Sequence, residues 1–225
     1  MAKKIYISPS SQDANMYATG NTNEANECRK IATELVKALK RCGFEAKTNV
    51  EKGKSMYDRV KESNAWGADA HIPIHTNACN GQVAGFRGFY YNTSGEGYPL
   101  VKAIMDAVAP ITPGTSDGVS SYPSLYEVKA SNAPCAYLEL GFHDNKEEAL
   151  YIINHTVELA EAICKGICNH YGVKYVAPTA TTTTTNTGKK LYRVQVGAYS
   201  QYENAKKQLA KIKAAGFTDA FINED

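Results

Sequence analysis

Hydrophobic positions before residue 176 switch between two spacings, which predicts strands separated by helices. Apolar residues recur at helical spacing through 24–42, after Asn23 or Thr22 as a plausible N-cap. Further helices are expected at 56–66, at 100–108 and in a long helical region at 147–171. Strands are expected at 4–8, 44–50, 71–75, 85–91 and 137–140. This order favours an α/β fold with a mostly parallel sheet and helices on both faces.

Composition changes after residue 175. Residues 176–190 are small, polar and rich in threonine, so they predict a flexible linker after a domain at 1–175. Residues 191–225 predict a strand at 191–196, a helix at 201–214 and the start of a strand at 220–222. This β-α-β segment is small for an independent core, because domains below roughly 40 residues usually need a staple or a partner.

Charge and cysteine usage narrow the class of protein. The hydrophobic fraction of 43% is that of a globular chain, and the formal net charge of +2 gives no electrostatic case for nucleic acid as a partner. No run of about 18 apolar residues occurs and the start MAKKIYISPS has no apolar leader, so we expect synthesis in a cytoplasm and no membrane insertion. The six cysteines favour reduced core residues over a disulfide scaffold, and Cys164 and Cys168 alone indicate a metal only weakly.

Three polar residues are expected at one edge of the sheet. Glu24 opens the first long helix, while His75 and Glu139 close apolar strands. Ligands of open α/β sheets bind where strand C-termini and helix N-termini meet. A histidine and two carboxylates at that edge suggest a metal-activated water with its base, and therefore a hydrolase.

Each of these residues also has a structural interpretation. Glu24 could serve the helix dipole or a capping box, His75 could be a hydrogen-bonded core histidine, and Glu139 could be a buried partner of a lysine. His71 lies four residues before His75, about 13 Å away along a strand, and is interpreted as structural. His143 follows Glu139 closely and could approach the site as a substrate contact.

The three segments together resemble a known family. ADAHIPIHTNA, NTNEANECRKIATELVKAL and APCAYLELGFHDNKEEA are similar to segments of zinc-dependent N-acetylmuramoyl-L-alanine amidases of the autolysin and endolysin type. The resemblance covers roughly residues 3–172, in the correct order. It implies Glu24 and His75 as zinc ligands and Glu139 as general base and acid.

One segment departs from that family's pattern. Members normally carry D-P-G-H after the first strand, and its histidine is a zinc ligand. Here the segment reads Ser8-Pro9-Ser10-Ser11-Gln12, so Ser11 or Gln12 stands at the position of that histidine, and no histidine occurs before residue 71. Either Gln12 supplies a side-chain oxygen, or water completes the site, or metal binding is weakened or lost. We expect Gln12 in the metal site and an active zinc enzyme, because Glu24, His75 and Glu139 remain.

The C-terminal segment LYRVQVGAYSQYENAKKQLAKIKAAGF resembles the first half of a sporulation-related (SPOR) repeat. That resemblance implies binding to peptidoglycan glycan strands. A full domain needs a second half, so the segment is expected to be partial. An unrelated β-α-β appendage is the alternative.

Together these resemblances predict a peptidoglycan hydrolase that cleaves the amide between N-acetylmuramic acid and L-alanine. We expect a phage-type endolysin, a monomer, that reaches the cell wall after release by another protein; a host autolysin is also possible. One alternative is a weak or inactive pseudo-enzyme that only binds peptidoglycan. Another is a zinc peptidase that acts within the stem peptide.

Overall fold

The computed structural model describes residues 2–178, 195–199, 201–217 and 220–222. These fall into two units, one within Met1–Thr179 and one within Ala180–Asp225, each described by itself. Most of the predicted linker at 176–190 lies outside the described residues. So do residues 191–194 of the strand predicted after it.

The first unit is built on a six-stranded sheet of order β2-β1-β3-β6-β4-β5. Its strands are β1 Lys4–Pro9, β2 Glu45–Thr48, β3 Ala70–Asn77, β4 Arg87–Tyr90, β5 Gly118–Ser121 and β6 Tyr137–Phe142. All neighbouring pairs are parallel except β4 and β6, which are antiparallel. The predicted mostly parallel α/β sheet is confirmed, although β5 had no counterpart among the expected strands.

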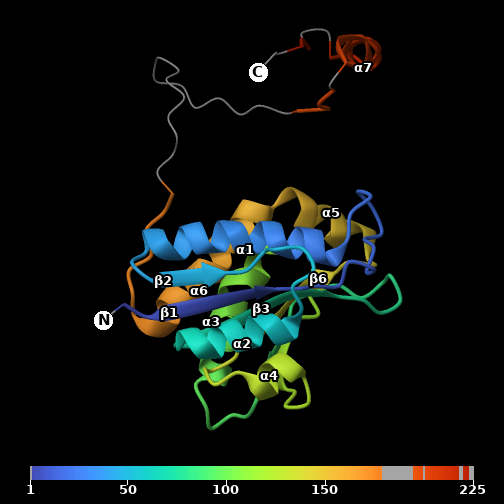
Figure 1. The fold of residues 1–225 in the computed structure, drawn as a ribbon. Coiled ribbons are helices and arrows are strands. Elements are labelled where there is room, and N and C mark those ends of the chain that lie inside the picture. The colour runs from blue at the N-terminus through green and yellow to red at the C-terminus, as the bar shows by residue number, and fades with distance from the viewer. Residues whose placement is uncertain (1, 179–194, 200, 218–219, 223–225) are drawn as a thin grey trace. The chain divides into compact units, whose positions relative to one another are not determined.

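Helices cover both faces of this sheet (Figure 1). They are α1 Glu24–Arg41, α2 Met56–Trp66, α3 Gly97–Val108, α4 Tyr126–Ala130, α5 Lys146–Asn154 and α6 Thr156–Tyr171, with a 3₁₀ turn at Ala109–Ile111. Helices α1 and α3 both pack against α6 on one face, and α2 and α4 lie on the other. The long helical region expected at 147–171 consists of two helices that meet at His155, and α4 was not predicted.

Local sequence explains the bounds of α1. The side chain of Asn23 accepts a hydrogen bond from the Asn26 backbone N–H at 2.9 Å, so Asn23 is the N-cap. The helix stops before Gly43, whose φ of 90° lies in the left-handed region that glycine adopts without strain. Between these ends, Ile31 and Leu35 face the core. The cap therefore fixes Glu24 as the first helical residue.

The two faces of the sheet carry unequal cores. The larger core lies under α1, α3 and α6, and includes Leu35, Ile104 and Ile163. The smaller core consists of Val128, Cys135 and Tyr137, with Phe89 and Leu125 against it. The short helix α4 is thus held to the sheet by a small apolar cluster.

Cys42, Cys164 and Cys168 bring their sulfur atoms within 4.8 Å of one another between α1 and α6. Burial raises the pKa of Cys168 to about 11 and the pKa of Cys164 further. Cys42 Sγ also accepts a hydrogen bond from the Val176 backbone N–H at 3.3 Å. These contacts are those of neutral, packed thiols. All six cysteines are free and five are buried, but Cys79 is exposed and was wrongly expected in the core.

In the second unit, α7 spans Tyr202–Ala214 and confirms the helix expected at 201–214. Residues 195–196 and 220–222 were expected in strands, but they carry no strand assignment. The described part of this unit therefore shows the predicted helix without its flanking strands.

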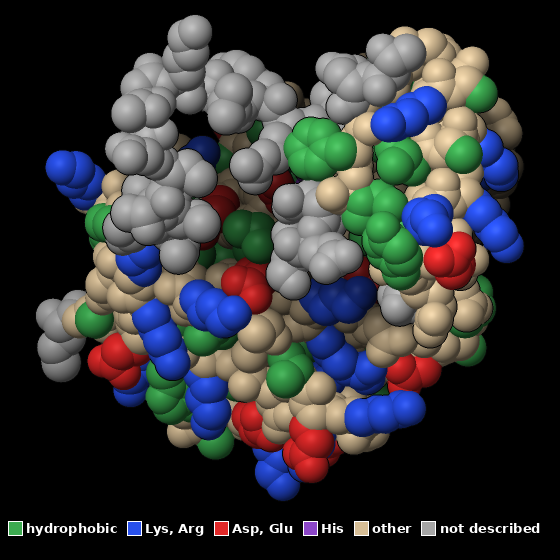
Figure 2. All heavy atoms as spheres, turned by 90° about the horizontal axis from the view of Figure 1, so that it is seen from above, with side chains coloured by type: hydrophobic (Ala, Val, Ile, Leu, Met, Phe, Trp, Pro, Cys, Tyr) green, Lys and Arg blue, Asp and Glu red, His purple; other side chains and the backbone are tan. Residues whose placement is uncertain are grey.

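The face in Figure 2 shows Lys and Arg side chains interspersed with Asp and Glu. This mixture agrees with the formal net charge of +2. Within the described residues, no helix has both the length and the apolar character needed to cross a bilayer.

Residues 1–178 should fold without the tail, whereas residues 1–174 should be less stable. The shorter chain loses the Tyr175 hydroxyl bond to Glu161 at 2.6 Å and the Arg41 bond to the Val176 carbonyl at 2.8 Å. At about 1 kcal/mol for each net hydrogen bond, the loss is roughly 2 kcal/mol. Thermal melting followed by circular dichroism should show residues 1–178 close to the full chain. Loss of cooperative melting in residues 1–178 would show that the tail belongs to the fold of the first unit.

Candidate active site

The polar site lies where α1 begins and where β3 and β6 run side by side. His75 and Glu139 are register partners on these parallel strands, so their side chains point to the same face. Glu24 opens α1, and Gln12 lies in the loop between β1 and α1. The fold thus brings together all four residues singled out from the sequence.

Three of these side chains are in direct contact. His75 Nδ1 lies 2.8 Å from Glu24 Oε1, and Gln12 Nε2 lies 3.4 Å from each of these atoms. Asn15 donates to Glu24 Oε2 at 2.7 Å and to Gln12 Oε1 at 3.0 Å. Glu24 is fully buried and His75 is 5% exposed, so these two groups interact with each other rather than with bulk water, whereas Gln12 is an exposed residue at the edge of the site.

Glu139 lies next to this group as the register partner of His75, and its Oε2 atom accepts no hydrogen bond from the described residues. That atom is shielded from solvent and has no partner among the described residues. Burial raises the pKa of Glu139 to about 8, with a further increase from the Glu24 charge and an opposing effect from His75. A carboxyl group with such a pKa can take up and return a proton near neutral pH.

Glu127 is the site residue that the sequence analysis missed. Its Oε2 atom lies 3.3 Å from His75 Nε2, and its Oε1 atom lies 3.3 Å from His71 Nε2. Ser8 donates its hydroxyl to the same Oε1 atom. The available signal was a glutamate between Tyr126 and Val128, which is the same kind of apolar setting that drew attention to Glu139.

The charges of this cluster stabilise each other. Burial alone would lower the pKa of His75, but hydrogen bonds to Glu127 and Glu24 outweigh burial and raise it to about 10. Burial would raise the pKa of Glu127, but His71 and His75 lower it to about 2. For Glu24 too, the bond to His75 outweighs burial and lowers the pKa. Without a metal, His75 is therefore a buried cation between two carboxylates.

The donor set fits a divalent cation such as zinc. An imidazole nitrogen, a carboxylate and a side-chain amide lie within 3.4 Å of one another, and Glu139, the register partner of His75, has an Oε2 atom without a partner among the described residues. Imidazole and carboxylate are common zinc ligands, and a cation would take the place of the proton on His75 Nδ1. The amide nitrogen of Gln12 faces the cluster, so a half-turn of the amide would present its oxygen.

The other two candidate histidines lie beside this cluster. His71 is fully buried, contacts Glu127 and stacks on Tyr6 at 5.7 Å. His143 contacts Thr76 through Nδ1 at 3.0 Å and stacks on Tyr17 at 5.5 Å. Both sets of contacts are packing and hydrogen-bond contacts within the fold.

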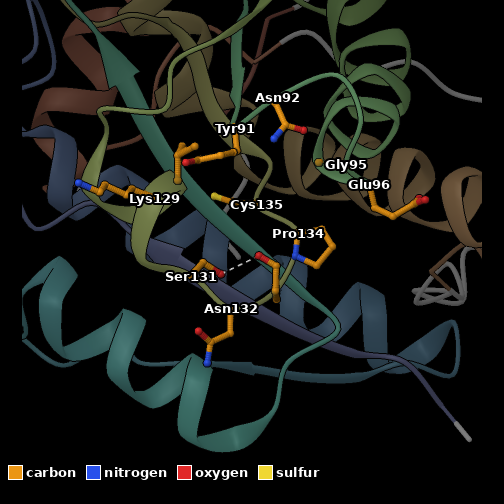
Figure 3. Close-up of a pocket in the computed structure, with 12 residues that line it drawn as sticks. Tyr91, Asn92, Gly95, Glu96, Lys129, Ser131, Asn132, Pro134 and Cys135 are labelled. Atoms are coloured by element: carbon orange, nitrogen blue, oxygen red, sulfur yellow. Dashed lines mark hydrogen bonds between the residues drawn. The ribbon is translucent and has the colours of Figure 1, made fainter.

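A separate hollow of about 340 Å³ lies at the other end of β6 (Figure 3). Its lining includes Tyr91 and Asn92 after β4, and Pro134 and Cys135 before β6. Because β4 and β6 are antiparallel, these four residues share the edge that is opposite to the C-terminal end of β6. None of the polar site residues lines this hollow.

Comparison with known families supports both resemblances drawn from the sequence. The family described as N-acetylmuramoyl-L-alanine amidase matches residues 5–169. The family described as SPOR domain matches residues 172–223, a range that includes the predicted linker.

Individual relatives agree with these matches. A sporulation-specific N-acetylmuramoyl-L-alanine amidase of Bacillus subtilis is 24% identical over 99% of this chain and 85% of its own length. A germination-specific N-acetylmuramoyl-L-alanine amidase of the same organism is 29% identical over 55% of this chain and 53% of its own length. The chain thus spans only about half of that second relative.

Solved structures share the fold at lower identity. The catalytic domain of CwlV, an N-acetylmuramoyl-L-alanine amidase from Bacillus (Paenibacillus) polymyxa, matches with a TM-score of 0.69 and 19% identity, over 76% of this chain and 99% of that chain. The catalytic domain of the CD27L endolysin, which targets Clostridia difficile, matches with a TM-score of 0.63 and 23% identity, over 74% of this chain and 97% of that chain.

In metal-free protein, Glu139→Gln should raise stability at high pH. The folded state raises the pKa of Glu139 to about 8, whereas an unperturbed glutamate carboxyl has a pKa of 4.5. The contribution of the Glu139 proton to the free energy of unfolding is therefore full below about pH 4.5, and it is lost as the pH rises through about 8. Denaturant unfolding in a chelator should give nearly equal stabilities at pH 5, and a variant more stable by a few kcal/mol at pH 9.

Glu34→Gln on α1 controls for the loss of one carboxylate elsewhere. A difference between Glu139→Gln and wild type that stays constant from pH 5 to pH 9 would contradict the raised pKa of Glu139.

Proposed function

Because this chain belongs to the N-acetylmuramoyl-L-alanine amidase family, we propose that its first unit is a zinc-dependent amidase acting on peptidoglycan. The bond cleaved is the amide between the lactyl group of N-acetylmuramic acid and L-alanine of the stem peptide. The observation that carries this proposal is the convergence of Gln12, Glu24 and His75 beside the unpartnered Oε2 of Glu139. Zinc peptidases of other specificity and a pure binding module are less favoured, because the family match covers residues 5–169.

Gln12, Glu24 and His75 would hold the zinc, with Gln12 in the place of a histidine that this chain lacks. When bound there, zinc supplies a Lewis acid that polarises the scissile carbonyl and makes a water molecule more acidic. Asn15 supports this set by donating to Glu24 Oε2, and in the present amide orientation it also donates to Gln12 Oε1. His75 is held from the side by Tyr137, whose ring stacks on the imidazole with a centroid separation of 4.7 Å.

Glu139 would move the proton. As a carboxylate it takes a proton from the attacking water on Oε2, and it then returns that proton to the leaving amine of L-alanine. Burial keeps its proton affinity high, and a positive charge beside it would draw its pKa back towards the neutral range. The parallel pairing of β3 and β6 holds this base next to the proposed zinc ligand His75.

The second unit would hold the enzyme on its substrate. The SPOR match at residues 172–223 supports a proposal that the tail binds glycan strands of peptidoglycan. We propose domain bounds of 1–175 for the catalytic part, 176–190 for the linker and 191–225 for the wall-binding segment. Tethering raises the effective concentration of the catalytic domain at the wall without adding contacts to the bond that is cut.

The biological setting belongs to the same proposal. A phage-type endolysin, monomeric and released to the wall by another protein, is supported by the fold shared with the CD27L endolysin domain. Relatives with sporulation-specific and germination-specific names support a host amidase instead. Both settings use the same site and the same bond.

Replacing the proposed base should abolish turnover and spare the metal. Glu139→Gln keeps the size of the side chain but removes its basicity, so release of soluble wall fragments should fall by about a hundredfold or more. Zinc content and melting temperature in zinc-loaded protein should stay near wild type, as they should in the Glu34→Gln control. Full lysis of purified peptidoglycan by Glu139→Gln would remove Glu139 from the mechanism.

Replacing the proposed ligands should change zinc affinity in both directions. Glu24→Ala and His75→Ala should lose zinc, whereas Gln12→His should bind it about tenfold more tightly or better, because imidazole replaces an amide. Each factor of ten corresponds to about 1.4 kcal/mol. Competition against a chelator of known affinity measures all three, with Gln12→Ala alongside. If Gln12→Ala binds zinc as well as wild type does, Gln12 is no ligand and another group completes the site.

A further inference from the structure

Glu127 lies on the far side of the His75 ring from the proposed metal. On one side, Nδ1 faces Glu24 and Gln12 at 2.8 and 3.4 Å. On the other side, Nε2 faces Glu127 Oε2 at 3.3 Å. The two ring nitrogens point in different directions, so one cation cannot be held by Nδ1 and Glu127 together. Glu127 is therefore placed to act through His75 rather than on the metal.

The hydrogen-bond roles of the ring follow from this arrangement. Ser8 donates its hydroxyl to Glu127 Oε1, which leaves Oε2 to accept the Nε2–H proton of His75. A histidine that donates Nε2–H keeps its Nδ1 lone pair for a cation. A carboxylate partner of this kind fixes the tautomer and ring orientation of a ligating histidine and makes that histidine a better ligand.

Glu127 is itself held from several directions. Val128, its neighbour in α4, packs in the small core with Cys135 and Tyr137. His71 on β3 lies 3.3 Å from Oε1, on the same strand as His75. Arg59 is fully buried on α2, and the negative charge of Glu127 counteracts the lowering of its pKa by burial. These contacts hold the Glu127 side chain in one position between α4 and β3.

We propose that Glu127 is a positioning residue that sets the tautomer and orientation of His75, so that Nδ1 is the atom offered to the metal. This inference rests on the proposed zinc site. It assigns a role to a residue in the five-residue helix α4, which carries no other group of the site. An amide such as that of Gln12 binds zinc more weakly than a histidine does. If Glu127 makes His75 a better zinc ligand, it offsets part of this loss of zinc affinity.

Zinc affinity of graded variants tests the proposal. Glu127→Gln keeps the size and an acceptor oxygen but removes the charge, so zinc affinity should fall about tenfold, and Glu127→Ala should lose about a hundredfold. Glu62→Gln is the matched control, because Glu62 accepts from Tyr6 and Asn49 on the same side of the sheet without touching His75. The measurement is chelator competition at one pH, with melting curves to confirm folding.

A second measurement needs no variant. In zinc-loaded wild type with ¹⁵N-labelled histidine, long-range ¹H–¹⁵N correlation spectra should show His75 with a proton on Nε2 and the metal on Nδ1. A proton on Nδ1 and zinc on Nε2 would overturn the proposal, even if the variants failed to fold. Folded Glu127→Ala with wild-type zinc affinity would also overturn it. If wild type binds no zinc at all, the proposed function fails first, and the two failures are distinguishable.

Discussion

The site depends on one arrangement, a single imidazole enclosed by carboxylates away from water. Glu24 and Glu127 flank His75 on opposite sides of its ring, and Glu139 lies beside them on β6. Burying several negative charges together is costly unless positive charge compensates them. In the absence of a metal, that charge is a proton on His75, whose pKa is raised to about 10. A cation bound at Nδ1 would replace this proton and extend the compensation to Glu139.

The register of β3 and β6 makes this arrangement possible. Pairing of His75 with Glu139 puts the proposed ligand and the proposed base on neighbouring strands of one parallel pair. A shift of one residue would turn one of the two side chains to the opposite face of the sheet. The large apolar core under α1, α3 and α6 specifies that register, because Ile74 and Leu138 must face it. Packing therefore positions the proposed ligand and the proposed base.

The sequence predicts most of this architecture, because long elements leave periodic patterns. Helix α1 was predicted within one residue of its C-terminal end, and its first residue Glu24 was identified correctly. Helix α4 was missed because five residues are too few for a helical period. Glu127 was missed with it, since its role depends on contacts with Ser8, His71 and His75, which lie far away in the chain.

The two ends of helix α1 make contacts with different parts of the chain. Its first residue, Glu24, belongs to the polar site, while Arg41 at its last position binds the carbonyl of Val176. With 18 residues at 1.5 Å each, the two ends are about 27 Å apart. Val176 thus lies at the end of α1 that is remote from the proposed active site. If the proposed function holds, a different wall-binding segment joined after Val176 would change which cell surface the enzyme adheres to, and the proposed site would keep its geometry.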